Sequence, residues 1–267
     1  MRARRSGSQV VRVATAFCAA AVLNLIGCRG SLSPLSNKLK VGEESYIVYA
    51  ADGEEGKGDL FASPPQGGKA FQITFTRVDE RAPALSPDGS ILAFLRSRTA
   101  QDTSGVSLVL FNLVNGAERR TGVPPAAFAL AWSSEGGSLL VRTPSGIFST
   151  TVPPQPLALS PVPASDRSRA DSLFRVILGD PPVGEAATCG WGAGVCARLS
   201  NGDSVTLSEQ GSAPMRWGND SVAYVEGGAF AVRPLAGGRI RMVRWTEQAR
   251  NPRGLTYFPG VNRNSER

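Results

Sequence analysis

The chain has 267 residues, 42% apolar and 19% charged, with 30 glycines and 19 prolines, a composition that excludes a disordered protein. The formal net charge is +7, but Arg2, Arg4, Arg5 and Arg12 account for much of it, because without them 25 basic residues face 22 acidic ones. A body so near neutrality argues against nucleic-acid binding, and the lack of any histidine removes the commonest general base and metal ligand.

The first 27 residues predict a signal peptide. A basic start, MRARRSGSQVVR, precedes the 15-residue apolar segment VATAFCAAAVLNLIG, which is shorter than the roughly 20 residues of a membrane-spanning helix. The last three residues of this segment and the cysteine that follows it form the motif Leu25-Ile26-Gly27-Cys28. This motif resembles the lipobox of bacterial lipoproteins. That resemblance implies cleavage after Gly27 and lipidation of Cys28. The alternative is an uncleaved membrane helix with a coincidental cysteine.

The same resemblance implies where the protein lies. Two or more acyl chains on Cys28 would hold it at a membrane where a single chain does not, so the membrane is the first expected partner. Arg29 stands in place of the aspartate that signals inner-membrane retention in this family, which implies the outer membrane, with the body facing the periplasm or the cell surface. Residues 28–43 predict a lipidated N-terminus followed by a polar, flexible tether.

A sequence pattern recurs between residues 44 and 260. The turn Ser86-Pro87-Asp88-Gly89 and the apolar run Leu92-Ala93-Phe94 return as Ser133–Gly136 and Leu139–Val141. Further copies of the apolar run are looser and occur at Ile47–Tyr49, Val195–Ala197 and Val222–Tyr224. Successive copies start 45, 47, 56 and 27 residues apart, which brackets the ~40 to 45 residues of a propeller blade.

Short strands and tight turns follow three of these copies. Strand-like segments at 59–62, 108–111 and 229–232 precede Gly-Gly or Asn-Gly turns, which join antiparallel strands. No helical periodicity of useful length appears after Gly30, so the sequence predicts an all-β fold. The Ser86–Gly89 turn and the strands after it resemble the TolB-type, WD-repeat-like β-propellers of bacterial envelopes.

This resemblance implies a β-propeller over residues 44–260. We expect five blades, with four or six blades as alternatives. The first blade lacks a strand before Tyr46, and we expect Gly254–Gly260 to supply it and close the ring. Residues 261–267 are expected to form a disordered tail. Blades bury their faces against their neighbours, and the residues expected between blades are Trp132, Trp191 and Trp217.

Ser160–Glu185 fits no repeat cleanly. We expect an insertion at a blade edge or a degenerate strand pair, and such surface loops are candidate partner contacts. At the other end of the body, Arg239, Arg241 and Arg244 alternate along a predicted strand. They predict either an exposed outer blade edge protected by charge or a contact with an acidic partner.

Cys189 and Cys196 enclose a glycine-rich turn that could bring them within bridging range. Outside the cytoplasm such a pair is usually oxidised, so we expect a structural disulfide, with two buried thiols as the alternative. A zinc site is not expected without histidine. The acidic cluster Asp52, Glu54, Glu55 and Asp59 matches no calcium loop and is expected to be a solvated hairpin loop.

The sequence predicts no catalytic residues, metal or cofactor. It has no G-x-S-x-G motif and no histidine, which excludes serine hydrolysis of the usual type. We therefore expect a non-enzymatic, lipid-anchored envelope protein whose propeller binds or scaffolds another envelope protein. The alternative is a propeller that binds a small ligand or glycan at its channel mouth, with carboxylate-based hydrolase or lyase chemistry. A third hypothesis is a purely structural role.

Overall fold

The structure is a computed structural model of the chain. It describes residues 35–53, 56–152, 157–174, 186–189, 194–199, 201–217, 221–235, 239–243 and 250–261. The predicted signal peptide and Cys28 lie outside these residues. Among the helices within them, none is long and apolar enough to cross a membrane.

The described strands form five antiparallel sheets, named I to V. Sheet I contains, in spatial order, β19 (Arg250–Phe258), β1 (Tyr46–Asp52), β2 (Gly58–Ser63) and β3 (Phe71–Gln72). Sheet II contains β4 (Asp79–Leu85), β5 (Ile91–Ser97), β6 (Ser107–Asn112) and β7 (Glu118–Gly122). Sheet III contains β11 (Ser160–Pro161), β10 (Gly146–Thr151), β9 (Ser138–Thr143) and β8 (Ala129–Trp132).

Sheet IV contains β12 (Ala186–Thr188), β13 (Val195–Arg198) and β14 (Ser204–Ser208). Sheet V contains β15 (Ser212–Trp217), β16 (Ser221–Glu226), β17 (Ala229–Pro234) and β18 (Arg241–Val243). A short 3-10 helix, η1 (Ala164–Asp166), and one helix, α1 (Arg167–Ser172), follow β11. The all-β prediction is confirmed for the described chain.

The recurring apolar run lies in the strand that pairs with the first strand of each sheet, where the first strands of sheets I to V are β19, β4, β8, β12 and β15. Its five copies lie in β1, β5, β9, β13 and β16. The turn before the run is also repeated in three dimensions, because Gly89 and Gly136 both have φ of +71°. In each turn a serine amide donates a hydrogen bond across the hairpin: Ser86 to the Ile91 carbonyl and Ser133 to the Ser138 carbonyl, both at 2.9 Å.

The C-terminal strand lies beside the first strand of the body. Tyr46 pairs with Phe258 and Tyr49 with Leu255 in the antiparallel ladder between β1 and β19. The Phe258 ring packs against Tyr46, with ring centroids 5.6 Å apart, and is 4% exposed. The predicted pairing of the C-terminal strand with the segment that starts at Tyr46 is therefore confirmed.

Neighbouring sheets pack face to face through apolar side chains. In β1, Tyr46 and Val48 belong to a cluster with sheet II, whereas Ile47 and Tyr49 belong to a cluster with sheet V. Side chains alternate across a strand, so a strand with apolar residues on both faces is buried from both sides. Similar clusters join sheet II to sheet III and sheet IV to sheet V.

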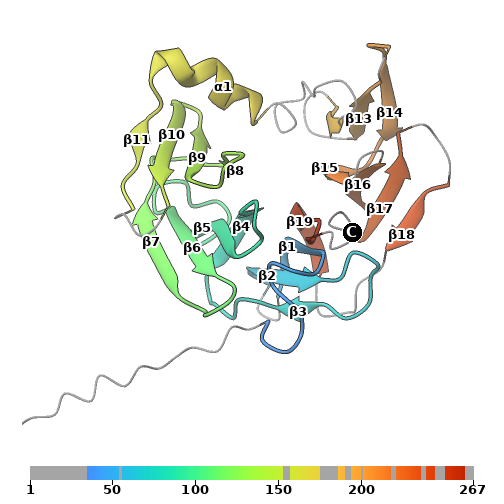
Figure 1. Cartoon of the computed structure of the whole chain (residues 1–267), viewed down its shortest axis with the longest axis horizontal. Helices are drawn as coiled ribbons and strands as arrows, with labels where there is room; N and C mark the ends of the chain where they lie inside the picture. Colours follow the sequence, from blue (N-terminus) through green and yellow to red (C-terminus); the bar gives the residue numbers. More distant parts are fainter. Residues whose placement is uncertain are drawn as a thin grey trace, which may run out of the picture. The chain divides into compact units, whose positions relative to one another are not determined.

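The first strands of neighbouring sheets lie next to one another, β19 beside β4, β4 beside β8, β15 beside β19, and β12 beside β15 (Figure 1). Trp132 at the end of β8 is 9% exposed, and its indole Nε1 donates a hydrogen bond to the Ala84 carbonyl of β4 at 3.0 Å. This confirms the predicted packing between sheets for Trp132. Trp191 and the side chain of Trp217 lie outside the described residues.

Helix α1 covers the face of sheet III that points away from sheet II. Ala170 and Phe174, 5% and 0% exposed, pack with Leu140 and Ile147 of that sheet. The prediction for Ser160–Glu185 needs correction, because Ser160–Pro161 pairs with β10 and completes sheet III. The helix after it was not expected, since six residues are too few to show a helical period. Residues 175–185 lie outside the described residues.

The folded body begins before residue 44. Leu35 is fully buried and packs between sheets I and II together with Leu113. Leu39 and Val41 pack against the same cluster. The expectation of a flexible tether up to residue 43 is therefore wrong for residues 35–43. The physical reason is that Leu35, Leu39 and Val41 are apolar, so that moving their side chains from water into the core stabilises the packed segment.

Candidate functional site

A pocket of about 530 Å³ lies between α1 and sheet III. We call it the α1 pocket. Its apolar floor is formed by Leu140, Val162 and Ala170, all at least 90% buried. Hydroxyl groups of Ser138 and Ser149, from β9 and β10, line its wall. The size lies within the usual range of ligand and side-chain pockets.

Charged side chains surround the mouth of the α1 pocket. Glu135, Asp166 and Arg169 all line it, and Arg169 Nη2 lies 3.5 Å from Glu135 Oε1. Both of these side chains are mostly exposed, 80% for Arg169 and 68% for Glu135, and exposed ion pairs stabilise little. The pair can therefore open to meet a binding partner at small cost.

The repeated turn positions Glu135. Ser133 Oγ accepts a hydrogen bond from the Ser138 amide at 3.1 Å, as Ser86 Oγ does from the Ile91 amide. Glu135 thus takes the turn position that Asp88 has in the preceding copy. A hydrogen bond from its own amide, helped by the Ser134 hydroxyl, lowers the pKa of Glu135. Glu135 is therefore ionised at neutral pH.

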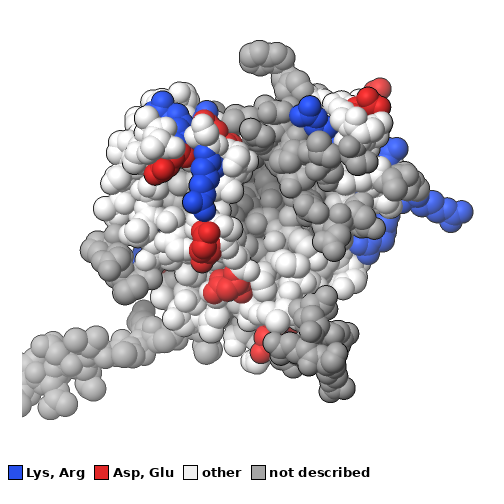
Figure 2. All heavy atoms as spheres, turned by 45° about the horizontal axis from the view of Figure 1, so that its top comes forward, with Lys and Arg blue, Asp and Glu red and all other residues white. Residues whose placement is uncertain are grey.

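Contacts near its C-terminal end hold helix α1 in place. Arg142 of β9 forms an ion pair with Asp171, and Phe174 beyond the helix is fully buried. In Figure 2 acidic and basic side chains lie side by side at the upper left, where α1 lies in Figure 1. The arrangement provides a fixed apolar floor with a movable charged rim, which suits binding rather than chemistry.

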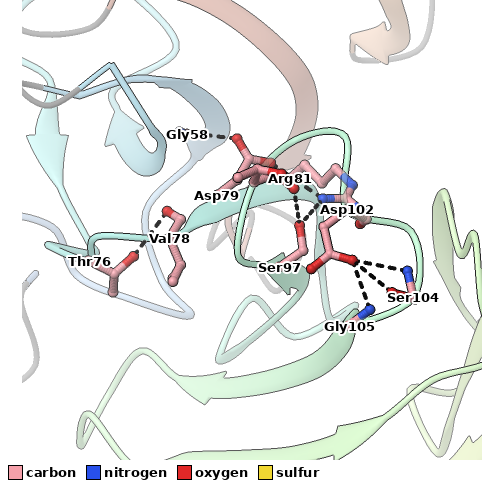
Figure 3. Close-up of polar contacts among 10 residues, drawn as sticks. Gly58, Thr76, Val78, Asp79, Arg81, Ser97, Asp102, Ser104 and Gly105 are labelled. Carbon is pink, nitrogen blue, oxygen red and sulfur yellow. Dashed lines mark hydrogen bonds and ion pairs between the residues drawn. The ribbon is translucent and has the colours of Figure 1, made fainter.

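A second polar cluster joins sheets I and II (Figure 3). Asp79 is 2% exposed, and it accepts hydrogen bonds from the Gly58 amide at 3.2 Å and from Arg81 at 3.4 Å. Arg81 also donates to the Ser97 hydroxyl and to the Asp102 carbonyl. The amides of Gly105 and Ser104 donate to the Asp102 carboxylate and lower its pKa.

Glu80 and Arg96 form a separate polar group, because neighbouring residues of a strand point to opposite faces and Asp79 belongs to the first cluster. Glu80 is fully buried, and Arg96 Nε donates to its Oε1 at 2.8 Å. Arg96 also donates to both carboxylate oxygens of Glu118, at 2.6 and 3.1 Å. Burial raises the pKa of Glu80, against the lowering effect of Thr74 and Arg96. Arg96 thus bridges Glu80 and Glu118, while the other carboxylate oxygen of Glu80, Oε2, is buried without a hydrogen-bond partner among the described residues.

The prediction of a solvated acidic loop is wrong for Asp59. Its side chain is buried and accepts hydrogen bonds from Gln72 Nε2 at 3.1 Å and from the Thr76 amide at 3.3 Å. A Cβ at Gly53 would lie 2.1 Å from Asp59 Oδ2, which explains glycine there. Asp52 is partly buried. Glu54 and Glu55 lie outside the described residues.

The predicted basic strand lies at an outer edge. β18 pairs with β17 through Arg241 and Val232 and is the last strand of sheet V. Arg239 and Arg241 are exposed, as expected of an edge protected by charge. Arg244 lies outside the described residues, and contact with an acidic partner stays a prediction.

Cys189 and Cys196 lie close together in the hairpin of β12 and β13, in which Cys196 pairs with Ala187 and Cys189 follows the end of β12. Their Cα atoms lie 5.1 Å apart and their sulfurs are placed as a disulfide, within the usual bridging range. The Cys189 amide donates to the Gly194 carbonyl at 3.1 Å. The geometry permits the bond, and its formation in the protein stays a prediction.

Replacing Cys189 and Cys196 with serine should lower the free energy of unfolding by roughly 2.5 kcal/mol, because the reduced chain gains loop entropy. Urea denaturation with and without a reducing agent measures the change. Reduced wild-type protein is the control and should match the double variant. Alkylation of both cysteines in unreduced, unfolded wild-type protein would contradict the prediction.

Sequence reasoning missed the residues of the α1 pocket and the Glu80–Arg96 pair. The one signal for the pair was the presence of charged residues in two largely buried strands, DERAPAL with three of them and ILAFLRS with one. Asp166 and Arg169 lie in Ser160–Glu185, which the sequence marked as a candidate partner contact because it fits no repeat, but neither residue was singled out. Among the described residues, no group of three or more acidic or cysteine side chains is arranged to hold a metal ion.

Comparisons with known proteins give distant likenesses. No family model and no curated protein matches the chain. Among solved structures, TolB from Acinetobacter baumannii matches with a TM-score of 0.44 and 12% identity, over 80% of this chain and 66% of that one. The chain thus spans slightly less than two thirds of that TolB protein.

Two further likenesses are of the same order. A putative TolB from Agrobacterium tumefaciens has a TM-score of 0.37 and 12% identity, over 80% of this chain and 71% of that one. A chain of a nidogen/laminin complex has a TM-score of 0.37 and 13% identity, over 80% and 81%. All three TM-scores are below 0.5.

Proposed function

We propose that this protein is a lipid-anchored protein of the bacterial envelope whose five-bladed propeller binds another envelope protein. The Leu25–Cys28 motif supports the anchor. Five sheets with apolar faces, and the pairing of β19 with β1, support a ring of five blades that the C-terminal strand closes. Sheets III and IV would then meet around α1 rather than directly.

The observation that carries the binding function is the α1 pocket. The helix departs from the repeat and covers sheet III where a neighbouring sheet would pack. It leaves an apolar floor behind a rim of Glu135, Asp166 and Arg169. Protein interfaces centre on apolar side chains in pockets with polar groups around them. An apolar side chain of the partner would enter the pocket, and charged neighbours would meet the rim.

The alternative of ligand or glycan binding at the channel mouth has less support. The α1 pocket is lined by the β8–β9 turn, β9, β10 and α1, and not by a ring of first strands. Its serines have no histidine to activate them, because the chain contains none. We therefore propose a binding protein without enzymatic activity.

The anchor is tested by palmitate labelling and membrane fractionation. Cys28→Ala should abolish the label and release the protein from membranes, because thioether lipidation needs the thiol. Cys18→Ala is the matched control, since Cys18 lies in the predicted signal peptide, and it should keep the label. Unlabelled wild-type protein would overturn the proposed anchor.

The contact surface is tested by photo-crosslinking in intact cells. A photoreactive residue in place of Arg169, on the pocket rim, should give a protein adduct that mass spectrometry identifies. The control carries the same group in place of Arg120, which is exposed on β7. Adding Ala170→Lys to the Arg169 variant should remove the adduct by filling the pocket. Adducts that are equal at both positions, or that survive the filled pocket, would contradict the proposed surface.

A further inference from the structure

The chain joins the folded body at a defined place. Leu35 is fully buried in the cluster between sheets I and II. The amides of Lys38 and Leu39 donate hydrogen bonds to its carbonyl at 2.9 and 3.2 Å, which closes a tight turn. The position of Leu35 is therefore set by the body.

The length of chain between Leu35 and Cys28 limits how far the body can lie from the lipid. Seven residues separate the two positions, and seven extended residues span at most about 25 Å. Strand β6 has six residues and is about 20 Å long. The end of β6 that lies near Leu35 is therefore held within about 25 Å of the lipid, whereas the other end, about 20 Å away along the strand, is not joined to the tether.

The surface at that end is partly apolar. A small pocket there, of about 220 Å³, is lined by five apolar residues, Leu35, Leu39, Val41, Leu113 and Val114, and by the polar residues Ser36 and Asn37. Val114, in the β6–β7 turn, is 61% exposed. Val114 would gain free energy by leaving water at a membrane surface, as any exposed apolar side chain does.

Positively charged side chains on this segment also favour contact with a membrane. Lys38 and Lys40 are exposed on the segment that lines the pocket, and lysines near an anionic membrane surface are attracted to it. The Lys38 ammonium lies 5.8 Å from the centre of the Phe71 ring. Glu43 and Glu44 are also exposed, and Glu44 Oε2 accepts a hydrogen bond from the Lys40 amide at 3.3 Å, so these acids reduce the attraction.

We propose that the surface formed by residues 36–41 and the β6–β7 turn lies against the membrane. We call it the membrane face. The proposal rests on the proposed lipid anchor at Cys28. It also assigns the opposite end of β6, with its β5–β6 loop, to the side of the body that points away from the bilayer.

Fluorescence quenching at the two ends of β6 tests the membrane face. The lipidated protein carries one new cysteine, at Val114→Cys or at Gln101→Cys, and is labelled with bimane under non-reducing conditions. Gln101 is exposed in the β5–β6 loop and is the matched control. The vesicles contain phosphatidylethanolamine, phosphatidylglycerol and a lipid with a nitroxide on its headgroup.

We expect bimane at position 114 to be quenched severalfold more strongly than bimane at position 101. Equal quenching at both positions, in protein that floats with the vesicles, would overturn the membrane face and leave the anchor intact. Protein that does not float with the vesicles would overturn the proposed anchor and the membrane face together. Circular dichroism of both labelled variants confirms that they are folded.

Discussion

Replacing Gly89 with alanine should destabilise the protein by about 2 to 5 kcal/mol. Gly89 has φ of +71°, a left-handed conformation that costs other residues about 1 to 2 kcal/mol. A Cβ there would also lie 2.7 Å from the Phe258 ring, and such overpacking costs typically 1 to 3 kcal/mol more. The clash would push apart the turn of sheet II and the C-terminal strand of sheet I.

Gly136 is the matched control for Gly89. It has the same φ in the next copy of the turn, but its Cβ would meet only Pro87 Cδ, at 3.4 Å. Gly136→Ala should therefore cost only the roughly 1 to 2 kcal/mol of backbone strain. Urea denaturation of both variants measures the difference. Equal losses would show that Phe258 does not press on the turn.

Replacing Arg96 with methionine should destabilise the protein by about 3 to 5 kcal/mol at neutral pH. Methionine keeps much of the apolar volume beside Phe94, whose ring lies 5.3 Å from the guanidinium. The charge is lost, and fully buried Glu80 is left without its partner at 2.8 Å. An uncompensated buried charge is among the most costly changes in a protein interior.

The effect of Arg96→Met should depend on pH. Burial already raises the pKa of Glu80 above its ordinary value of 4.5, and losing Arg96 raises the pKa further, because Arg96 opposes that shift. A carboxyl group whose pKa is higher in the folded protein than in the unfolded chain stabilises the fold at pH values below its unfolded-state pKa. This contribution is lost as the pH rises through its folded-state pKa. The deficit of the variant relative to wild type should therefore shrink as pH falls from neutral towards 4.5.

The double variant Glu80→Gln/Arg96→Met is the control for this pH dependence. It has no buried carboxylate, so its stability relative to wild type should not recover through the titration of Glu80. Denaturation curves at a series of pH values measure all three proteins. A deficit in Arg96→Met that is independent of pH would show that Glu80 does not carry the buried charge.

Prediction from sequence succeeded where a pattern is local. The strands around Leu92–Phe94 and Leu139–Val141 follow from apolar runs, and the turns before them follow from glycine at positions of positive φ. Both signals lie within about ten residues, so they need no knowledge of neighbours. The repeat added the order of the strands, because each copy has to form the same kind of sheet.

Prediction failed where contacts join distant residues without a repeated pattern. Asp59 was placed in water because its neighbours in sequence are acidic, yet Gln72 and Thr76 bury it. Residues 35–43 were assigned to a tether because they are polar on average, yet a single leucine, Leu35, anchors them in the core. Average composition hides such individual side chains.

The sequence by itself determined the strands and the turns, because alternation and glycine placement act over a few residues. The pairing of the C-terminal strand with β1 was predicted from the resemblance to propellers, because the predicted first blade lacked a strand before Tyr46. Only the tertiary structure decided that α1 covers sheet III and that Glu80 and Arg96 meet between strands. The physical reason is that burial and charge pairing depend on which surfaces come together. The candidate site belongs to this second group, since the α1 pocket exists only where a helix outside the repeat meets a sheet within it.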